Sequence, residues 1–402
     1  MRRDGALAQL WAVMSREHPI FAEPKRPTPL RTASTLWSTI NRTNSAFPKY
    51  QVVSEQAIVD LTGSDLSGAY LLDAELYGAN LVDANLIGAD LTRANLTSAD
   101  LTGANLTGAL LDTADLSGAD LTRVGLNSAD LSDADLTRAI LTGADLTRAN
   151  LTRTNLFGAY LYNANLNKAS LIDANLDDAN LARANLTGAD LTTAHLNDAN
   201  LTNARLIKAR LIRANMVNTR LDGARLEDAS IHDANLSKAN LTLANLTQAN
   251  LTKANLADAN LTRATLMRAT LSYATLMRAN LMHANLRRAE LNDAVLHDAN
   301  LADADLAKAN LVRADLTDAN LTNAVLADTL LVSARLVRAD LTGVMGLRLA
   351  QLPNVLWSRS TQWPDDNFLA DVAARSEPAG PGLYRVRGQE SDVPNGSPLA
   401  SV

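Results

Sequence analysis

The chain has 402 residues, of which 47% are hydrophobic and 20% are charged, and its formal net charge is −6 at pH 7. It contains no cysteine, which excludes disulfide bonds, thiolate metal sites and cysteine nucleophiles. Only 4% of the residues are aromatic and no run of about 18 apolar residues occurs, so we expect neither an ordinary globular core nor a membrane-spanning helix, and we predict a cytoplasmic location.

Residues 1–58 differ in composition from the sequence that follows. Four apolar residues at helical spacing within residues 6–16 predict a short helix. Residues 19–29 contain four prolines, which predicts a stiff and extended linker. We therefore assign residues 1–58 to an N-terminal segment made of a short helix, a Pro-rich linker and a cap.

A strict repeat of five residues occupies residues 59–343. An apolar residue stands at every fifth position from Leu61 to Leu341, and 55 of these 57 positions are Leu, with Met216 and Ile231 as the exceptions. Two residues earlier the chain has Ala in 51 of the 57 cases, and the residue between is usually Asn or Asp. The consensus is Ala-(Asn/Asp)-Leu-x-x, and the repeat contains neither Pro nor Trp.

A period of five fits neither regular secondary structure. On an α-helix the leucines would move around the cylinder, and on a flat strand they would alternate between the two sides. Ala and Leu within one unit are two residues apart and share a face, so each unit must contain an extended side and a bend, and glycine at the second x position suits that bend. The sequence thus predicts a solenoid with Leu and Ala inside. Representative core positions are Leu61, Leu101, Leu196, Met216, Ile231 and Leu341.

This pattern resembles that of the pentapeptide-repeat family. The resemblance implies an all-β fold, a right-handed quadrilateral parallel β-helix with four pentapeptides per turn, and hence about 14 turns for 57 units. The family includes bacterial proteins that resemble B-DNA in shape and charge, bind type II topoisomerases and protect against quinolones. The resemblance therefore implies DNA gyrase or topoisomerase IV as a candidate partner.

Residues 344–402 are predicted to form a C-terminal cap followed by a partly disordered tail at residues 390–402. A solenoid exposes unpaired strand edges at its ends, and caps protect such edges. Residues 355–357 and 362–364 contain tryptophans that could cover apolar residues facing outward from the last repeats, and residues 382–387 read as one further strand. These outward-facing residues are Leu330, Val332 and Val337. The same apolar patch could instead form a homodimer interface, so a monomer and a homodimer through the C-terminal end both remain open.

No catalytic signature is present. The five histidines lack metal-ligand spacing, and no P-loop, His-Glu-x-x-His or Gly-x-Ser-x-Gly motif occurs. The carboxylates belong to repeat positions that would point outward from a convex surface. We predict no enzymatic activity, no cofactor and no metal site.

Charge is distributed unevenly along the repeat. Residues 59–120 carry ten acidic residues against one Arg, whereas residues 201–290 carry thirteen Lys and Arg against six acidic residues. Sparse aromatic residues and the negative overall charge argue against direct nucleic-acid binding. The candidate partner surfaces are an acidic set, a basic set, an aromatic set and a mixed set. The acidic set is Asp73, Asp83 and Asp90, and the basic set is Arg205, Arg210 and Arg213. The aromatic set is Phe157 and Tyr160, with Tyr162. The mixed set is Arg268, Tyr273 and Arg288, with Met277, Arg278 and Met282.

Two hypotheses for function follow. The first is a non-catalytic, rod-shaped protein–protein interaction module or scaffold whose protein partner is unknown. The alternative is a DNA-mimicking binder of type II topoisomerase that acts through the acidic N-terminal turns.

Overall fold

The computed structural model describes residues 59–388. The helix predicted in residues 6–16, the linker at residues 19–29 and the tail at residues 390–402 lie outside these residues. The chain divides into two compact units, one ending at Arg210 and one beginning at Leu211, which we call unit 1 and unit 2. No helix in the described stretch has the length and apolar character needed to cross a bilayer.

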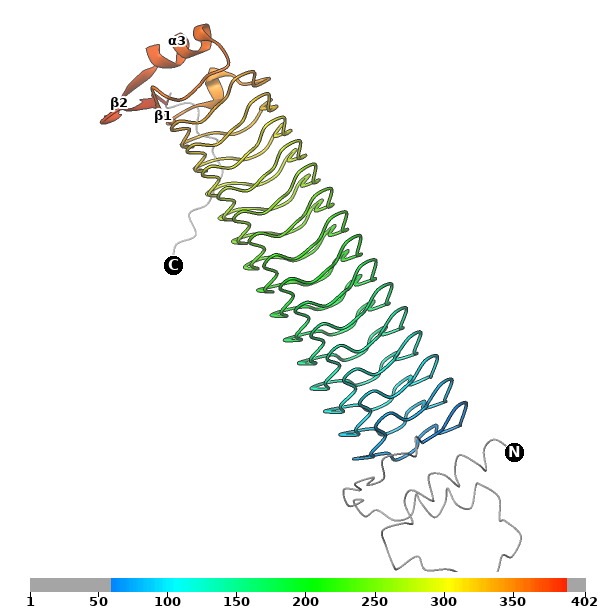
Figure 1. The fold of residues 1–402 in the computed structure, drawn as a ribbon. Helices are drawn as coiled ribbons and strands as arrows, with labels where there is room; N and C mark the ends of the chain where they lie inside the picture. The colour runs from blue at the N-terminus through cyan, green and yellow to red at the C-terminus, as the bar shows by residue number, and fades with distance from the viewer. Residues whose placement is uncertain (1–58, 389–402) are drawn as a thin grey trace, which may run out of the picture. The chain divides into compact units, whose positions relative to one another are not determined.

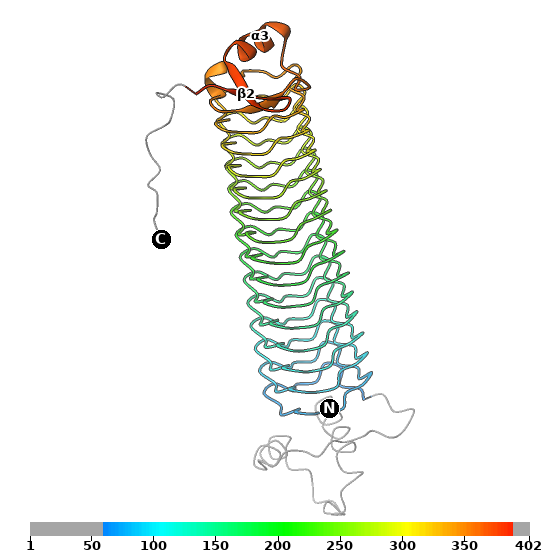
Figure 2. The ribbon, with the colours of Figure 1, turned by 90° about the vertical axis from the view of Figure 1, so that its left-hand side faces the viewer.

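Each unit is built from coils that stack in parallel (Figure 1; Figure 2). In unit 1 Asn85 forms a parallel bridge with Asn105, and in unit 2 Asn235 does so with Asn255. Because the leucines recur every fifth position, the interval between bridged residues contains four pentapeptides. The coil length implied by the family resemblance is therefore confirmed.

Each pentapeptide ends its extended side in a tight turn. The Leu carbonyl accepts a hydrogen bond from the amide three residues later, as in Ala94 N to Leu91 O at 2.9 Å. The residue just before that amide, which is the second x position, has a positive φ, for example 57° at Arg93 and 67° at Gly143. A β-turn with a positive φ at its third residue favours glycine, which explains the glycines at this position. Many repeats nevertheless place Asp, Arg, Lys or Asn there.

Where Asn or Asp precedes the Leu, its side chain can stabilise the same turn. Its side-chain oxygen accepts the backbone amide two residues later, as at Asp90 (Thr92 N, 3.1 Å) and Asn235 (Ser237 N, 3.2 Å). This is the local hydrogen bond that makes Asn and Asp favourable in turns. Asn side chains also bond between coils, and Asn255 Nδ2 donates to Asn235 Oδ1 at 3.0 Å.

The interior consists of the Leu and Ala positions. All six representative core residues, Leu61, Leu101, Leu196, Met216, Ile231 and Leu341, have an exposed fraction of 0%. Where Thr replaces Ala, its buried hydroxyl finds a carbonyl, as in Thr154 Oγ1 to Leu131 O at 2.7 Å. An inward polar group is therefore tolerated where a backbone oxygen lies within reach.

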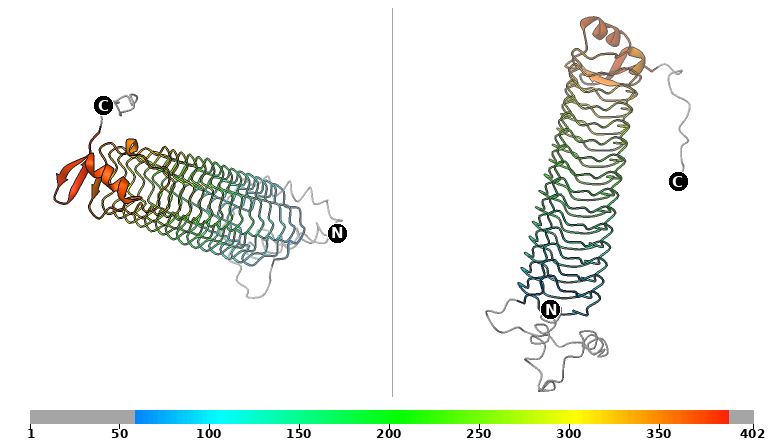
Figure 3. Two further views of the ribbon diagram at one scale, coloured as in Figure 1. Left: turned by 90° about the horizontal axis from the view of Figure 1, so that it is seen from above. Right: turned by 90° about the vertical axis from the view of Figure 1, so that its right-hand side faces the viewer.

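The C-terminal residues of unit 2 form a small cap (Figure 3). It begins with η2 (Leu349–Gln351) and β1 (Leu356–Ser358), and it continues with α3 (Asp366–Ala374), β2 (Ser376–Gly380) and β3 (Leu383–Val386). The three strands form an antiparallel sheet in the order β1-β3-β2. The strand expected over residues 382–387 is present as β3, whereas α3 and β2 were not anticipated from the sequence.

The cap continues the strand pairing of the last coil. Arg335 bridges in parallel to Leu356 of β1, and Asp340 bridges to Gln362. Trp357 and Trp363 pack edge to face with their centroids 5.9 Å apart and are only 4% and 6% exposed. The two bridges pair the edge of the last coil, which would otherwise be free to pair with another chain. Of the outward apolar residues expected beneath the tail, Val337 is buried, Val332 is half-buried and Leu330 remains 45% exposed.

Candidate functional site

Residues one coil apart occupy the same place on successive coils, and this relation determines which outward side chains meet. We use "corner" for the second x position of a pentapeptide, the residue with positive φ. A coil has four corners, and residues two pentapeptides apart lie at opposite ones because two pentapeptides are half a coil. Neighbours in sequence therefore often face different directions.

Five corner arginines each form a bidentate ion pair with an aspartate. The Nε–Oδ1 distances are 2.6–2.7 Å and the Nη2–Oδ2 distances are 2.5–2.8 Å. In every pair the Asp lies one coil before the Arg. The pairs are Asp73–Arg93, Asp133–Arg153, Asp258–Arg278, Asp293–Arg313 and Asp318–Arg338.

These ion pairs shift the pKa values of both partners. The hydrogen bond from the arginine is the largest cause of a lowered pKa at Asp133, Asp258, Asp293 and Asp318. The hydrogen bond from Asp133 likewise raises the pKa of Arg153. Both partners stay charged at neutral pH, and each pair links two adjacent coils.

The pairs predict a stability that depends on pH. Because the aspartate pKa is lower in the folded than in the unfolded chain, the pairs stabilise the fold above the ordinary aspartate pKa of about 3.9 and lose this contribution as the pH falls through their folded pKa values. A variant with Asn at positions 133, 258, 293 and 318 should have a lower Tm than the wild type at neutral pH. Thermal unfolding from about pH 7 down to about pH 2 should show the two Tm values converging in acid. A constant difference across this range would contradict the assignment.

The acidic candidates of unit 1 do not form one surface. Asp73 and Asp83 are two pentapeptides apart and stand at opposite corners, and Asp73 is already paired with Arg93. Asp90 lies at a bridge position and accepts the Thr92 amide through Oδ1. The carboxylates are thus spread around the coils rather than gathered on one face.

The basic candidates fall into both units. In unit 1, Arg205 and Arg210 occupy bridge positions one pentapeptide apart, and Arg210 Nη1 lies 3.3 Å from Asp190 Oδ2. In unit 2, Arg213 is a corner residue.

The mixed candidates of unit 2 are separated by the coil. Arg268 and Arg288 are one coil apart and share one corner, while Tyr273 stands at the next corner and Arg278 at the one after. Tyr273 has an exposed fraction of 54%, and Arg278 is paired with Asp258. Only Arg268 and Arg288 of this set are therefore brought together by stacking.

The aromatic candidates of unit 1 are better gathered. Tyr160 bridges to Ile140 on the preceding coil, and the two are 52% and 37% exposed. Two residues along the chain, the Tyr162 hydroxyl accepts a hydrogen bond from Arg183 Nη1 at 3.0 Å, and the guanidinium lies 5.8 Å from the ring centroid. Phe157 belongs to the preceding pentapeptide and is half-buried.

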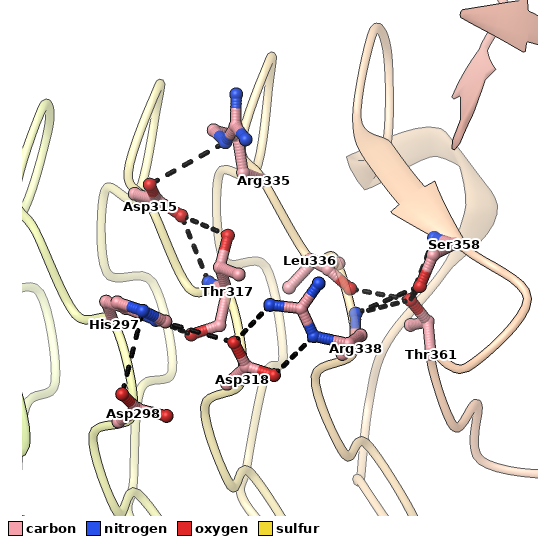
Figure 4. A network of polar contacts seen from close by, with 10 residues as sticks. All are labelled: His297, Asp298, Asp315, Thr317, Asp318, Arg335, Leu336, Arg338, Ser358 and Thr361. Carbon is pink, nitrogen blue, oxygen red and sulfur yellow. Dashed lines mark hydrogen bonds and ion pairs between the residues drawn. The ribbon is translucent and has the colours of Figure 1, made fainter. Parts of the chain in front are cut away.

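His297, Asp298 and Asp318 bring their ligand atoms within 4.8 Å of one another (Figure 4). Both Asp318 oxygens already accept hydrogen bonds from Arg338, and His297 Nδ1 lies 2.8 Å from the Thr317 carbonyl oxygen, to which it must donate. A cation would have to displace Arg338. The Arg338 amide lies 3.1 Å from Ser358 Oγ and 3.2 Å from Thr361 Oγ1, so this network connects the last coil to the cap.

Comparison with known proteins identifies the repeat. The family model described as pentapeptide repeats (8 copies) matches overlapping stretches that together cover more than half of the chain. The matched residues are 59–93, 89–127, 114–153, 129–167, 154–192, 194–233, 204–242, 244–281, 279–318 and 309–344. No curated protein matches the chain significantly in sequence.

Two solved structures illustrate the likeness. The chain is 33% identical to HetL, a pentapeptide repeat protein involved in heterocyst differentiation regulation from the cyanobacterium Nostoc sp. strain PCC 7120, over 61% of this chain and 89% of HetL, with a TM-score of 0.24. It is 15% identical to QnrB1, a plasmid-mediated fluoroquinolone resistance protein, over 48% of this chain and 96% of QnrB1, with a TM-score of 0.30. Pentapeptide repeats fold as right-handed quadrilateral β-helices, and the coils of four pentapeptides agree with this fold. With its matched repeats and coils of four pentapeptides, the chain belongs to the pentapeptide-repeat family.

Proposed function

We propose that the chain is a non-catalytic protein–protein interaction module that presents different side chains on successive coils. The proposal rests on the different environments of the positions within each pentapeptide. The Leu and Ala positions are buried, whereas the corner residues vary between Gly, Asp, Arg, Lys, Ser and Tyr without disturbing the turn. Such a scaffold holds partner-binding groups at set positions, and the turn accepts many different residues there.

A second feature supports binding rather than catalysis. The outward groups are held by hydrogen bonds and ion pairs that satisfy the coil itself, such as the Asp–Arg pairs and the bonds from Asn and Asp to turn amides. Catalysis needs groups that converge in a concave and partly dry site. The convex arrangement of the corners favours recognition of another surface.

The test is capture followed by reconstitution. Full-length chain carrying a photo-cross-linker would be used to capture partners from the native host, and each captured protein would then be purified and titrated against the unlabelled chain. We expect at least one stoichiometric complex whose cross-links lie on exposed positions of residues 59–343. If no captured protein forms a complex with the purified chain, the proposal is wrong.

A second candidate function is binding of DNA gyrase through the acidic coils of unit 1. The supporting observation is the presence of ten acidic residues against one Arg in residues 59–120. A cationic DNA-binding groove would attract this excess of negative charge over long range, even though the carboxylates are spread around the coils. Micromolar chain should then inhibit gyrase supercoiling or relieve quinolone inhibition, and charge reversal at Asp83 and Asp90 should weaken the effect. Absence of both effects eliminates this candidate.

A further inference from the structure

Three cations stack at one corner of unit 2. Arg268, Arg288 and Lys308 stand at the same corner of successive coils, all have positive φ and all are exposed. The Arg268 amide donates to Arg287 O and the Arg288 amide donates to Ala307 O, each at 3.0 Å, so the three coils are in direct register. We call these three residues the basic corner. Adjacent coils are about 4.8 Å apart, so the corner spans about 10 Å.

The basic corner lacks the pairing found at five other corner arginines. In all five bidentate pairs, the corner arginine reaches an Asp that occupies the same corner one coil earlier. The residue one coil before Arg268 is Gln248, and the residues before Arg288 and Lys308 are themselves cations. Across residues 59–388, no ion pair or side-chain hydrogen bond is found for any of the three.

Within residues 59–388, Asp328 stands at the same corner one coil after Lys308 but forms no ion pair with it, and two other nearby carboxylates are bonded to other groups. Asp305 Oδ2 lies 3.1 Å from Arg287 Nη1, and Asp305 Oδ1 accepts the Ala307 amide. Glu290 Oε2 accepts a hydrogen bond from Asn310 Nδ2 at 2.8 Å. Like charges on directly adjacent strands are unfavourable, so this arrangement costs the fold stability without any compensating contact in this part of the chain.

We propose that the basic corner binds an extended acidic segment of a partner protein. The proposal deepens the interaction-module function and rests on it. Carboxylates on one side of an extended peptide recur about every 6.7 Å, so two or three of them match a cationic row about 10 Å long. The arginine side chains at the five paired corners likewise form bidentate ion pairs with carboxylates.

A nucleic acid fits this surface less well. Single-strand binding combines a cationic track with aromatic rings on which bases stack. The positions flanking the basic corner hold Met267, Thr270, Arg287, Glu290 and Asn310, none of which supplies a ring.

The pairing rule itself supplies a test variant that preserves the fold. Arg268→Asp places an aspartate one coil before Arg288 and so recreates the arrangement of the five natural pairs. This change reverses the charge at position 268 and gives Arg288 an aspartate with which to form an ion pair. The matched control is Arg263→Asp, which makes the same charge change at an exposed residue of positive φ on a different corner of the same unit.

The experiment measures fluorescence anisotropy of a short labelled peptide of alternating Glu and Ser, titrated with full-length chain at low salt. We expect the peptide to bind, its twin of alternating Gln and Ser not to bind, and Arg268→Asp to weaken binding by about fivefold or more, against less than about twofold for Arg263→Asp. Equal effects of the two variants, or binding of the uncharged twin, would overturn the proposal. Tighter binding of a labelled single-stranded DNA of similar length would overturn it in favour of a nucleic acid.

The same variants separate this proposal from the function on which it rests. If a reconstituted protein complex forms equally well with the wild type and with Arg268→Asp, the interaction module stands and the basic corner is not its binding site. If no complex forms with the wild type, the proposed function itself fails, whatever the peptide shows. A complex weakened by Arg268→Asp but not by Arg263→Asp supports both.

Discussion

Replacing Leu126 with Asp is expected to destabilise unit 1 by about 4 kcal/mol or more. Leu126 is fully buried, and its amide is bonded to Asp145 O at 2.7 Å, between coils that carry Leu at the same position. The change loses about 1.5–3 kcal/mol of side-chain burial and places a carboxylate where nothing pairs with it. Circular dichroism on heating should show a large fall in Tm or loss of the folded signal.

The control for this variant is Ser128→Asp, two residues further along the chain. Ser128 is an exposed corner residue with a φ of 56°, and several other repeats have Asp at the same position. We expect its Tm to stay close to that of the wild type. Similar Tm losses for the two variants would mean that the inward and outward positions are wrongly assigned.

Replacing Ile140 with Pro is expected to cost about 3 kcal/mol or more. The Ile140 amide donates to Ala119 O at 2.9 Å, and Ile140 bridges to Asp120 and Tyr160 on the adjoining coils. Proline removes this donor and fixes φ at a value unsuited to a paired strand. Equilibrium unfolding in denaturant should report the loss of stability directly.

Thr142→Pro provides the matched comparison. Thr142 follows Leu141 as the second residue of the turn, where proline is favoured, and its amide has no acceptor among residues 59–388. Its carbonyl, which accepts the Arg123 amide at 3.0 Å, would be retained. We expect at most a small loss of stability, and a cost as large as that of Ile140→Pro would contradict the described turn.

The period of five was sufficient to predict which side chains are buried. Ala and Leu two residues apart, such as Ala99 and Leu101, must share a face, and a bend in each unit must return the next pair to the same side. The number of units per coil did not follow from the period, because it depends on the angle at each turn. That number came from the family resemblance, and the Asp100–Asp120 bridge and its equivalents confirm it.

The surfaces were harder to predict than the core. Arg268, Tyr273 and Arg278 are close in sequence, yet they stand at three different corners because each pentapeptide turns the chain by a quarter of a coil. Stacking is visible only between residues one full coil apart, as for Asp133 and Arg153, which form an ion pair. In the five bidentate corner pairs the Asp lies one coil before the Arg, and this direction depends on side-chain geometry that spacing alone does not contain.

The hydrogen bonds that stabilise the turns were predictable from the sequence. Asn or Asp, which stands directly before most of the leucines, usually accepts the amide two residues later in turns. The cap could be predicted only in part. Trp357 and Trp363 indicated its position, but α3 lies outside the repeat and no sequence pattern predicted it.

A distance measurement between two spin labels tests whether one coil contains four pentapeptides. Because the chain has no cysteine, Ser98→Cys and Asp178→Cys introduce two unique labelling sites, both exposed corner residues of unit 1 separated by sixteen pentapeptides. Coils of four pentapeptides place them four coils apart at the same corner, so electron–electron double resonance should give a distance of about 19 Å. Coils of three pentapeptides would separate the two sites by about 26 Å along the axis and place them at different corners, so a distance above about 26 Å would contradict coils of four.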